Sequence, residues 1–263
     1  RRTASRSRSR SPAAGSATEH GPDVPSSGRL GGYEWRAVPR RGRLFSLAAV
    51  GGSGSSVGMD ATLPDYAFEA RLRALGAHRV AGVDEAGRGP LAGPVVAAAV
   101  ILNRDDIPDG LNDSKLLTAE RRQVLHDRLL DCAEVGVGQA SVEEIDEINI
   151  LRASHLAMIR ALSMLGGVCH ALIDGNMIPD GIACRAEAVV KGDGRCFSIA
   201  AASIVAKCVR DRIMVDLAQQ FPGYGWETNA GYATAAHQSA LRNLGATPHH
   251  RRSFAPVHNI LYQ

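Results

Sequence analysis

Four acidic side chains stand at or near the ends of predicted β-strands, and acids placed in this way can share a site. They are Asp84, Glu85, Asp174 and Asp193. They follow three apolar runs, at positions 79–83, 169–173 and 186–191, that have the composition of strands. In an α/β sheet, functional groups gather beyond the carboxyl ends of strands. We therefore expect the four carboxylates to converge on one place.

Converging carboxylates predict a metal site. Two like charges 4 Å apart repel each other by roughly 4 kcal/mol at an effective dielectric near 20, so the group needs a counter-ion. Oxygen ligands select hard ions such as Mg²⁺ or Mn²⁺, and the absence of a His/Cys ligand set argues against zinc. Two such ions bridged by carboxylates would suit in-line hydrolysis of a phosphodiester.

Each acid also has a simpler interpretation. Aspartate before glycine is a common turn signal, and both Asp174 and Asp193 precede glycine. Asp84 and Glu85 raise a geometric difficulty, because adjacent residues of a regular strand face opposite sides of the sheet. Both could point into one site only if the strand ends or bulges there, which the glycines that follow would permit.

The rest of the pattern predicts the elements that must position these acids. Helices are expected over residues 68–75, 118–130, 142–149, 151–165 and 198–220. Further strands are expected over 95–102 and 134–140, and the glycine turn after residue 85 should join 79–83 to 95–102 as a hairpin. Strands that alternate with helices indicate an α/β fold.

Charge is divided unevenly along the chain. The net charge is +3, but residues 1–58 hold ten arginines against three acids, so the remainder carries −4. The Arg/Ser/Gly-rich segment 1–58 shows no periodicity and is predicted to be a disordered tail, whereas 59–263 is predicted to be the catalytic domain. The tail could be an RNA-binding arm, an organellar transit peptide or translated sequence upstream of a start at Met59, and we favour the last.

Several classes of protein are disfavoured. No apolar run approaches the roughly 18 to 20 residues of a membrane span. Five cysteines without a C-x-x-C pair favour reduced thiols in a cytosolic protein. Gly87, Gly89 and Gly93 have the wrong spacing for a dinucleotide-binding turn and precede a strand rather than a helix, and no phosphate-binding P-loop is present.

Several motifs carry a more specific signal. In chain order they are GVDEAGRGPLAGPV from Gly82, LNDSK from Leu111, IDEINI from Ile145, DGN from Asp174, KGD from Lys191, SIAAASIVAK from Ser198, RDR from Arg210, GY from Gly231 with Thr234 and His237, and HRRSF from His250. Together they resemble bacterial ribonuclease HII, the type 2 ribonuclease H, over about residues 79–257. Matches in this number and order are highly specific.

The resemblance implies a ribonuclease H-like α/β fold: a mixed sheet with flanking helices and a C-terminal helical portion. It implies catalytic, metal-binding roles for Asp84, Glu85, Asp174 and Asp193, with two Mn²⁺ or Mg²⁺ ions. The substrates would be RNA·DNA hybrids and duplex DNA that contains single ribonucleotides, cut on the 5′ side of the ribonucleotide to leave 3′-hydroxyl and 5′-phosphate ends. We also expect a monomer in the cytoplasm without a membrane partner.

Substrate-binding roles are implied for a further set of residues: Gly87, Arg88, Gly89, Lys115, Lys191, Lys207 and Tyr232. The glycine-arginine-glycine turn would read the ribose 2′-hydroxyl through its backbone, since residues without side chains can approach a sugar closely. Tyr232 would pack against the following deoxyribose, and the lysines would contact phosphates. Where many relatives have a lysine directly before Gly231, this chain has Ala230.

Alternatives stay open for these residues and for the function. The lysines could be solvated surface groups, Ser203 could serve helix packing, and His237, His249, His250 and His258 are interpreted as structural. A type 3 ribonuclease H or a junction resolvase would share the acids, but type 3 enzymes carry a folded N-terminal substrate-binding domain. A non-catalytic hybrid-binding protein would be expected to lack at least one carboxylate, and all four are present.

Overall fold

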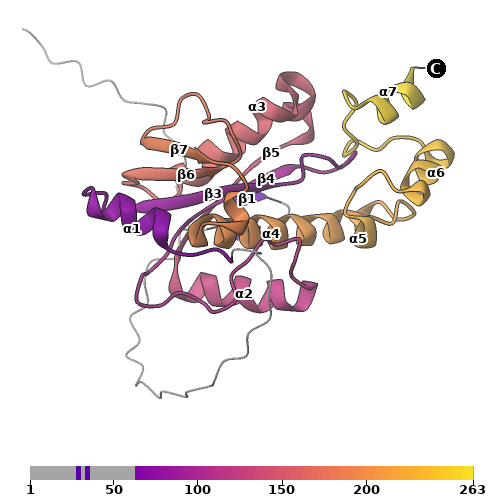
Figure 1. The fold of residues 1–263 in the computed structure, drawn as a ribbon. Coiled ribbons are helices and arrows are strands. Elements are labelled where there is room, and N and C mark those ends of the chain that lie inside the picture. The colour runs from indigo at the N-terminus through magenta and orange to yellow at the C-terminus, as the bar shows by residue number, and fades with distance from the viewer. Residues whose placement is uncertain (1–27, 31–32, 36–62, 263) are drawn as a thin grey trace, which may run out of the picture.

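The computed structural model describes residues 28–30, 33–35 and 63–262. Its centre is a five-stranded sheet with the strand order β5-β4-β3-β6-β7 (Figure 1). The strands are β3 (Val80–Ala86), β4 (Val95–Ile101), β5 (Glu134–Ala140), β6 (His170–Asp174) and β7 (Arg185–Val189). β3 and β4 form the predicted antiparallel hairpin, whereas β6 and β7 run parallel to β3. The sheet is therefore mixed, as predicted.

Helices cover both faces of this sheet. They are α1 (Ala67–Ala74), α2 (Ala119–Cys132), α3 (Val142–Ser163) and α4 (Phe197–Gln220). In Figure 1, α3 lies above the sheet and α4 and α2 lie below it. Thr118 caps α2 through a bond from the Arg121 amide, and Ser141 with Glu144 forms a capping box at the start of α3. These layers confirm the predicted flanking helices.

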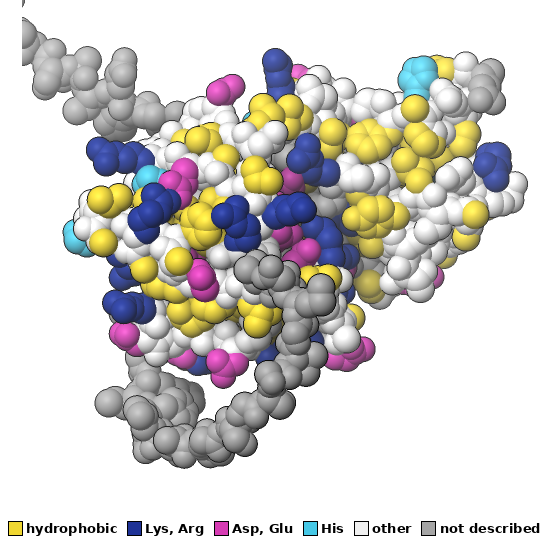
Figure 2. All heavy atoms as spheres, in the orientation of Figure 1, with side chains coloured by type: hydrophobic (Ala, Val, Ile, Leu, Met, Phe, Trp, Pro, Cys, Tyr) yellow, Lys and Arg dark blue, Asp and Glu magenta, His cyan; other side chains and the backbone are white. Residues whose placement is uncertain are grey.

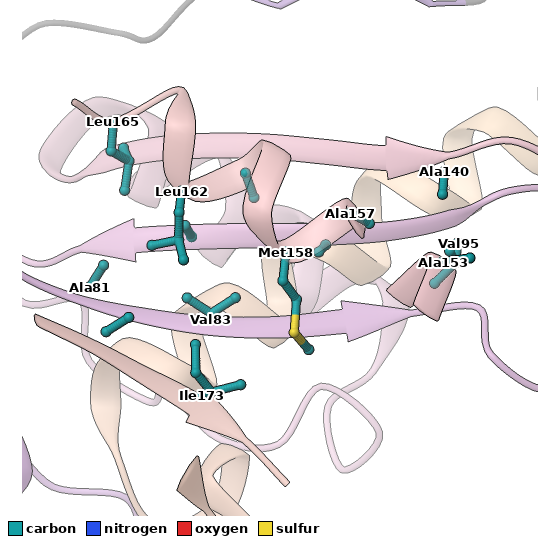
Figure 3. Close-up of a cluster of buried hydrophobic side chains, with 14 of the residues drawn as sticks. Ala81, Val83, Val95, Ala140, Ala153, Ala157, Met158, Leu162, Leu165 and Ile173 are labelled. Atoms are coloured by element: carbon teal, nitrogen blue, oxygen red, sulfur yellow. The ribbon is translucent and has the colours of Figure 1, made fainter. Parts of the chain in front are cut away.

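The core explains why β4 is a continuous apolar strand. All seven of its residues, VVAAAVI, are buried, since both of its faces meet helices. One face joins Ala81 and Val83 of β3 in the core beneath α3, where Met158 and Leu162 pack (Figure 3). The small side chains of β3 let α4 approach closely: a Cβ at Gly82 would lie 2.1 Å from the Ser198 carbonyl carbon.

The C-terminal portion is helical, as predicted. It contains α5 (Trp226–Asn229), α6 (Ala235–Leu244) and α7 (Ala255–Leu261), which extend from the end of α4 (Figure 1). α3 is kinked at Asn149, which has a φ of 69° and is the last residue of the first of the two helical stretches predicted there, 142–149 and 151–165. None of the helices in the described part of the chain is long and apolar enough to cross a membrane.

Two details of the strand ends differ from prediction. β3 neither ends nor bulges at Asp84: its pairing with β4 continues without interruption through Glu85 to Ala86. β7 ends at Val189, so Asp193 lies beyond the strand, in the 3₁₀ turn Gly192–Gly194. The left-handed conformation of Lys191 (φ 55°) starts this turn and redirects the chain. Thus the acids reach the sheet edge by three different local geometries.

Most of the predicted tail, residues 1–58, lies outside the described residues. Within it the structure describes β1 (Gly28–Leu30) and β2 (Tyr33–Trp35), which pair as two short antiparallel strands. The origin of this segment stays a prediction.

Candidate active site

Three of the four predicted carboxylates meet at one edge of the sheet. Oxygen atoms of Asp84, Asp174 and Asp193 all lie within 4.8 Å of one another, and we call these three residues the acid cluster. Asp84 lies within β3, two residues before its last residue, Asp174 is the last residue of β6, and Asp193 lies in the 3₁₀ turn before α4. Strands β3 and β6 are parallel neighbours, so their carboxyl ends bring two of the acids together directly.

Backbone amides orient each acid of the cluster. The Gly192 amide donates to Asp174 Oδ1 at 2.7 Å and thereby joins β6 to the turn that carries Asp193. Asp84 Oδ1 accepts a bond from the Glu85 amide at 2.7 Å, and Asp193 Oδ1 accepts one from the Gly194 amide at 3.0 Å. The acids are therefore held in place by short-range contacts before any ligand arrives.

Electrostatics make the acid cluster unfavourable when every member is ionised. Burial, followed by the nearby charges of Glu85 and Asp174, holds the pKa of Asp84 well above its ordinary value. Burial and the charge of Asp193 raise the pKa of Asp174. Carboxylates in this state attract protons or a cation, so the geometry supports the predicted need for positive charge.

Glu85 borders the same cleft, but its carboxylate lies outside the acid cluster. Its Oε1 accepts a hydrogen bond from Arg88 Nη1 at 3.1 Å. Burial raises the pKa of Glu85, while the adjacent Arg88 lowers it. The uninterrupted strand accounts for the separation, because side-chain directions alternate along β3, although Glu85 stays close enough for its charge to raise the pKa of Asp84.

A cleft of about 270 Å³ opens beside the acids. Of the predicted substrate-binding residues, it is lined by Gly87, Arg88, Gly89, Lys115, Lys207 and Tyr232. Tyr232 is 46% exposed, and a Cβ at Gly89 would lie 3.5 Å from its ring. The turn and the tyrosine are thus adjacent walls of one cleft. Figure 2 shows acidic side chains bordered by lysines and arginines near the middle of this face.

The three lysines differ in their surroundings. Lys115 Nζ lies 3.4 Å from Asp193 Oδ2 and 3.8 Å from Asp113 Oδ1, with most of its side chain exposed. Lys207 forms an ion pair with Asp211 at 2.6 Å. Lys191 is exposed and is not among the residues that line the cleft. Only two of the three lysines therefore share the cleft with the acids.

A larger hollow of about 630 Å³ lies at the opposite end of β3 and β4. It is lined by basic residues that include Arg73 and Arg79, but Arg79 is already paired with Glu134 through two bonds of 2.9 Å. No cluster of metal-ligating groups adjoins it in the part of the chain that the structure describes. Size alone does not locate the chemistry, and the smaller cleft is the candidate active site.

The structure also brings in residues to which the sequence assigned no role. Ser114 lies in the cleft, and its amide donates to Ser203 Oγ at 3.1 Å, so Ser203 fixes the 111–115 segment against α4. Arg210 lines the cleft from α4, and the buried Arg251 lies behind the glycine-arginine-glycine turn. Both arginines occur in motifs of the resemblance, which was the only available signal.

The histidines interpreted as structural belong mainly to the C-terminal portion. His237 Nε2 accepts a bond from Trp226 Nε1 at 3.0 Å and lies 3.1 Å from His250 Nε2, while His237 Nδ1 lies 2.9 Å from the Tyr232 carbonyl. Both imidazoles are fully buried. This network holds the backbone of Tyr232 at the rim of the cleft and has no contact with the acid cluster.

Comparisons with known proteins identify the family of this chain. The family model for Ribonuclease HII matches residues 81–257. The chain is 65% identical to a Ribonuclease HII of Ruegeria pomeroyi over 229 residues, which cover 86% of this chain and 97% of that protein. It is 64% identical to a Ribonuclease HII of Paracoccus denitrificans, over 75% and 95% of the two chains.

Solved structures support the same fold. The crystal structure of ribonuclease H2 from Pyrococcus horikoshii is similar with a TM-score of 0.58 and 29% identity, over 69% of this chain and 96% of that one. Bst-RNase HIII, solved in complex with Mn²⁺, is similar with a TM-score of 0.59 and 21% identity, over 72% and 71%, a likeness of fold alone. The chain belongs to the ribonuclease HII family and is an endoribonuclease that hydrolyses the RNA strand of RNA·DNA hybrids.

Proposed function

We propose that this enzyme cuts duplex DNA on the 5′ side of a single embedded ribonucleotide, as well as RNA in hybrids, at the acid cluster and with two divalent ions. The observation that carries the proposal is the position of the acid cluster. Asp84 and Asp174 line one cleft with the glycine-arginine-glycine turn and with the half-exposed Tyr232, and Asp193 has a carboxylate oxygen within 4.8 Å of both acids. Hydrolysis and recognition of a ribose therefore have their groups in one place.

The residues present fit a hard divalent metal. The acid cluster offers carboxylate oxygens within 4.8 Å of one another, and burial together with neighbouring acids raises the pKa of Asp84 and of Asp174, which supports a bound cation there. Glu85 stands beside it and would join the ligands by exchanging Arg88 for the metal. The bound ions would supply the activation of a water molecule and the stabilisation of the leaving 3′ oxygen. Mg²⁺ and Mn²⁺ both suit oxygen ligands, and the Mn²⁺ complex of Bst-RNase HIII makes Mn²⁺ the first ion to test.

The chain's own groups position the substrate strand. Lys115, 3.4 Å from Asp193 and largely exposed, can move to a phosphate once a metal neutralises that acid. Lys207, which also lines the cleft and is paired with Asp211, offers a second cation. Lys191 lies outside the cleft lining, so we assign it at most a contact with a distant phosphate.

Recognition of the ribonucleotide would depend on the turn. Gly87 has a φ of 98°, and Gly89 has no side chain to fill the space before Tyr232, so the backbone of the turn is open to a sugar. A backbone donor or acceptor there can bond the 2′-hydroxyl, the group that separates RNA from DNA. Tyr232 can then pack against the next sugar, which makes a ribonucleotide followed by a deoxyribonucleotide the preferred junction.

The test is cleavage of a labelled DNA duplex that contains one ribonucleotide. The full chain would be incubated with it in Mn²⁺, in Mg²⁺ and in EDTA, beside an all-DNA duplex of the same sequence and a continuous RNA·DNA hybrid. We expect one metal-dependent cut on the 5′ side of the ribonucleotide, with 3′-hydroxyl and 5′-phosphate ends, and no cut in the all-DNA duplex.

Two results would contradict the proposal. Efficient cleavage of the hybrid without any cut at the single ribonucleotide would remove the junction specificity. Tight binding of the ribonucleotide duplex without cleavage in either ion would remove the catalytic role of the acid cluster on this substrate.

A further inference from the structure

Arg251 lies fully buried behind the glycine-arginine-glycine turn, and every side-chain hydrogen bond that it donates goes to a main-chain carbonyl of the same loop. Its Nη2 donates to the Gly87 carbonyl at 2.6 Å and to the Pro94 carbonyl at 3.2 Å. Its Nη1 donates to the Arg88 carbonyl at 3.0 Å, and its Nε to the Gly93 carbonyl at 2.9 Å. One guanidinium is thus hydrogen-bonded to both ends of the loop 87–94.

Arg210, on α4, also donates hydrogen bonds to carbonyls of the loop 87–94, and it donates one more to the loop before Tyr232. Its Nε donates to the Pro94 carbonyl and its Nη2 to the Ala92 carbonyl, each at 3.1 Å. Its Nη1 donates to the Ala230 carbonyl at 3.0 Å, two residues before Tyr232. Arg210 therefore sets the distance between the turn and Tyr232. We call Arg210 and Arg251 the arginine pair.

The arginine pair is unusual in its balance of charge. Both side chains are at most 1% exposed, and among the described residues neither forms an ion pair with a carboxylate. Burial lowers the pKa of Arg210 to about 10, and burial together with the neighbouring Arg210 lowers that of Arg251 to about 9. Two charges buried side by side are costly, and apolar residues would fill the same space more cheaply. Such a cost indicates a role beyond packing.

The contacts determine which way the loop's peptide groups point. In a planar trans peptide, the carbonyl of one residue and the amide of the next point in opposite directions, and the described chain has no cis peptide. Because the Gly87 and Arg88 carbonyls point inward to Arg251, the amides of Arg88 and Gly89 point away from it. These residues line the cleft, so their N–H groups are directed to its side.

We propose that Arg210 and Arg251 are positioning residues for ribose recognition: by binding the carbonyls of the loop 87–94 they present its amides to the 2′-hydroxyl and hold the turn at a set distance from Tyr232. This inference rests on the proposed function. It also explains Gly87, since a Cβ there would lie 2.0 Å from Arg210 Nε. The glycine is required by the arginine behind it as well as by its φ of 98°.

The test compares Arg251→Lys and Arg210→Lys with the wild-type full chain. Lysine keeps the charge but cannot reproduce the fork that reaches several carbonyls at once. For each protein, KM and kcat would be measured on the duplex with one ribonucleotide, and the all-DNA duplex would be used as a competitive inhibitor to give Ki. Arg252→Lys, the exposed neighbour, is the matched control. Thermal unfolding reports on the fold.

We expect KM for the ribonucleotide duplex to rise on the order of tenfold in both variants, the effect of a lost hydrogen bond. Ki for the DNA duplex should stay unchanged, because the substitutions leave the lysines intact and DNA has no 2′-hydroxyl for the turn to bind. Gly87→Ala, which pushes Arg210 away from the loop, should give the same split between KM and Ki. Arg252→Lys should resemble the wild type.

Other outcomes have separate meanings. If KM and Ki rise together, or if neither lysine variant folds, the arginine pair supports the fold rather than recognition and the proposal is overturned. If the wild type itself does not distinguish the ribonucleotide duplex from DNA, the proposed function fails first, whatever the variants do.

Discussion

The acid cluster and the arginine pair lie beside the same cleft, since Asp84, Asp174 and Arg210 line it, and they differ in how their charges are balanced. Each brings like charges together in a buried place. The carboxylates of Asp84 and Asp174 have few partners beyond single backbone amides, and their pKa values are raised. The two guanidinium groups donate seven hydrogen bonds to main-chain carbonyls of the protein.

This difference separates a site that needs a ligand from one that does not. The acid cluster becomes stable only with protons or a cation, so its chemistry waits for a metal. The arginine pair is satisfied by the chain itself and can therefore act as a rigid support for the turn. An acid cluster that requires a metal, combined with a turn that is already in position, would let the enzyme cut only where a ribose is bound.

The largest expected effect comes from breaking the acid cluster. Asp174→Asn removes a carboxylate of the proposed metal site while it keeps the shape of the side chain and the bond from the Gly192 amide. We expect single-turnover cleavage in Mn²⁺ or Mg²⁺ to fall by at least about a thousandfold. Asp131→Asn, at an exposed position of α2, is the control and should cut normally. Near-normal cleavage by Asp174→Asn would contradict the assignment of Asp174 to the metal site.

The same variant should be no less stable than the wild type without metal. Because the native pKa of Asp84 and of Asp174 is raised above the unfolded value, native protein binds protons more tightly, and this contribution to stability is lost as pH rises through the raised values. We would measure the free energy of unfolding of both proteins in EDTA from pH 5 to pH 8. The value for the wild type minus the value for Asp174→Asn should become more negative as the pH rises. A difference that grows in the other direction would contradict the raised pKa values.

The histidine network beside the arginine pair should titrate in the opposite direction. Burial, with smaller effects of His237 and His249, lowers the pKa of His250 to about 4. The unfolded chain then binds more protons, so stability should fall as pH drops from about 6.5 to about 4, by up to about 3 kcal/mol. Urea unfolding would show this slope in wild type and in the exposed control His258→Asn. If the same pH dependence of stability persists in His250→Asn, groups other than His250 cause it.

A smaller effect should follow when the support of the arginine pair is loosened. Asp146 accepts bonds from the Arg252 and Ser253 amides, each at 2.9 Å, and from the Ser253 hydroxyl at 2.6 Å. These bonds anchor the segment that carries Arg251 to α3. Asp146→Ala should lower the free energy of unfolding by about 2 kcal/mol, whereas Glu147→Ala on the exposed side of α3 should change little. Equal losses in both variants would exclude the anchor.

The smallest expected effect is a gain in the free energy of unfolding. Ala230, whose carbonyl accepts from Arg210, has a φ of 48° in the left-handed region, where a Cβ is unfavourable. Ala230→Gly should raise the free energy of unfolding by about 0.5 kcal/mol, the relief of strain being partly offset by a more flexible unfolded chain. Ala233→Gly, at a position without positive φ, should not stabilise, and a gain there would show that strain at Ala230 is not the cause.

Local patterns were sufficient for the elements and for the acids. The strand predicted over 134–140 coincides with β5, Thr118 was recognised as a cap, and three of the four acids do meet at the sheet edge. The course of β3 through Glu85 was predicted wrongly, because two acids before a glycine suggest a break that the pairing with β4 overrides. Backbone hydrogen bonds of a central strand outweighed the local turn signal.

The arginine pair could not be predicted from the sequence by physical reasoning. Arg251 contacts carbonyls more than 150 residues earlier in the chain, and carbonyls are present at every position, so no residue pattern marks them. Tyr232 and the turn were paired only by the resemblance to a family. Their contact depends on how the C-terminal portion docks on the sheet, which no local periodicity describes.

The most direct test of the account is a map of the cuts in a duplex with four consecutive ribonucleotides followed by DNA, made with the full chain in Mn²⁺. If the turn reads a ribose while Tyr232 packs against the next deoxyribose, cleavage should concentrate on the 5′ side of the last ribonucleotide. Cuts spread evenly through the four ribonucleotides would contradict the joint reading of the junction by the turn and Tyr232.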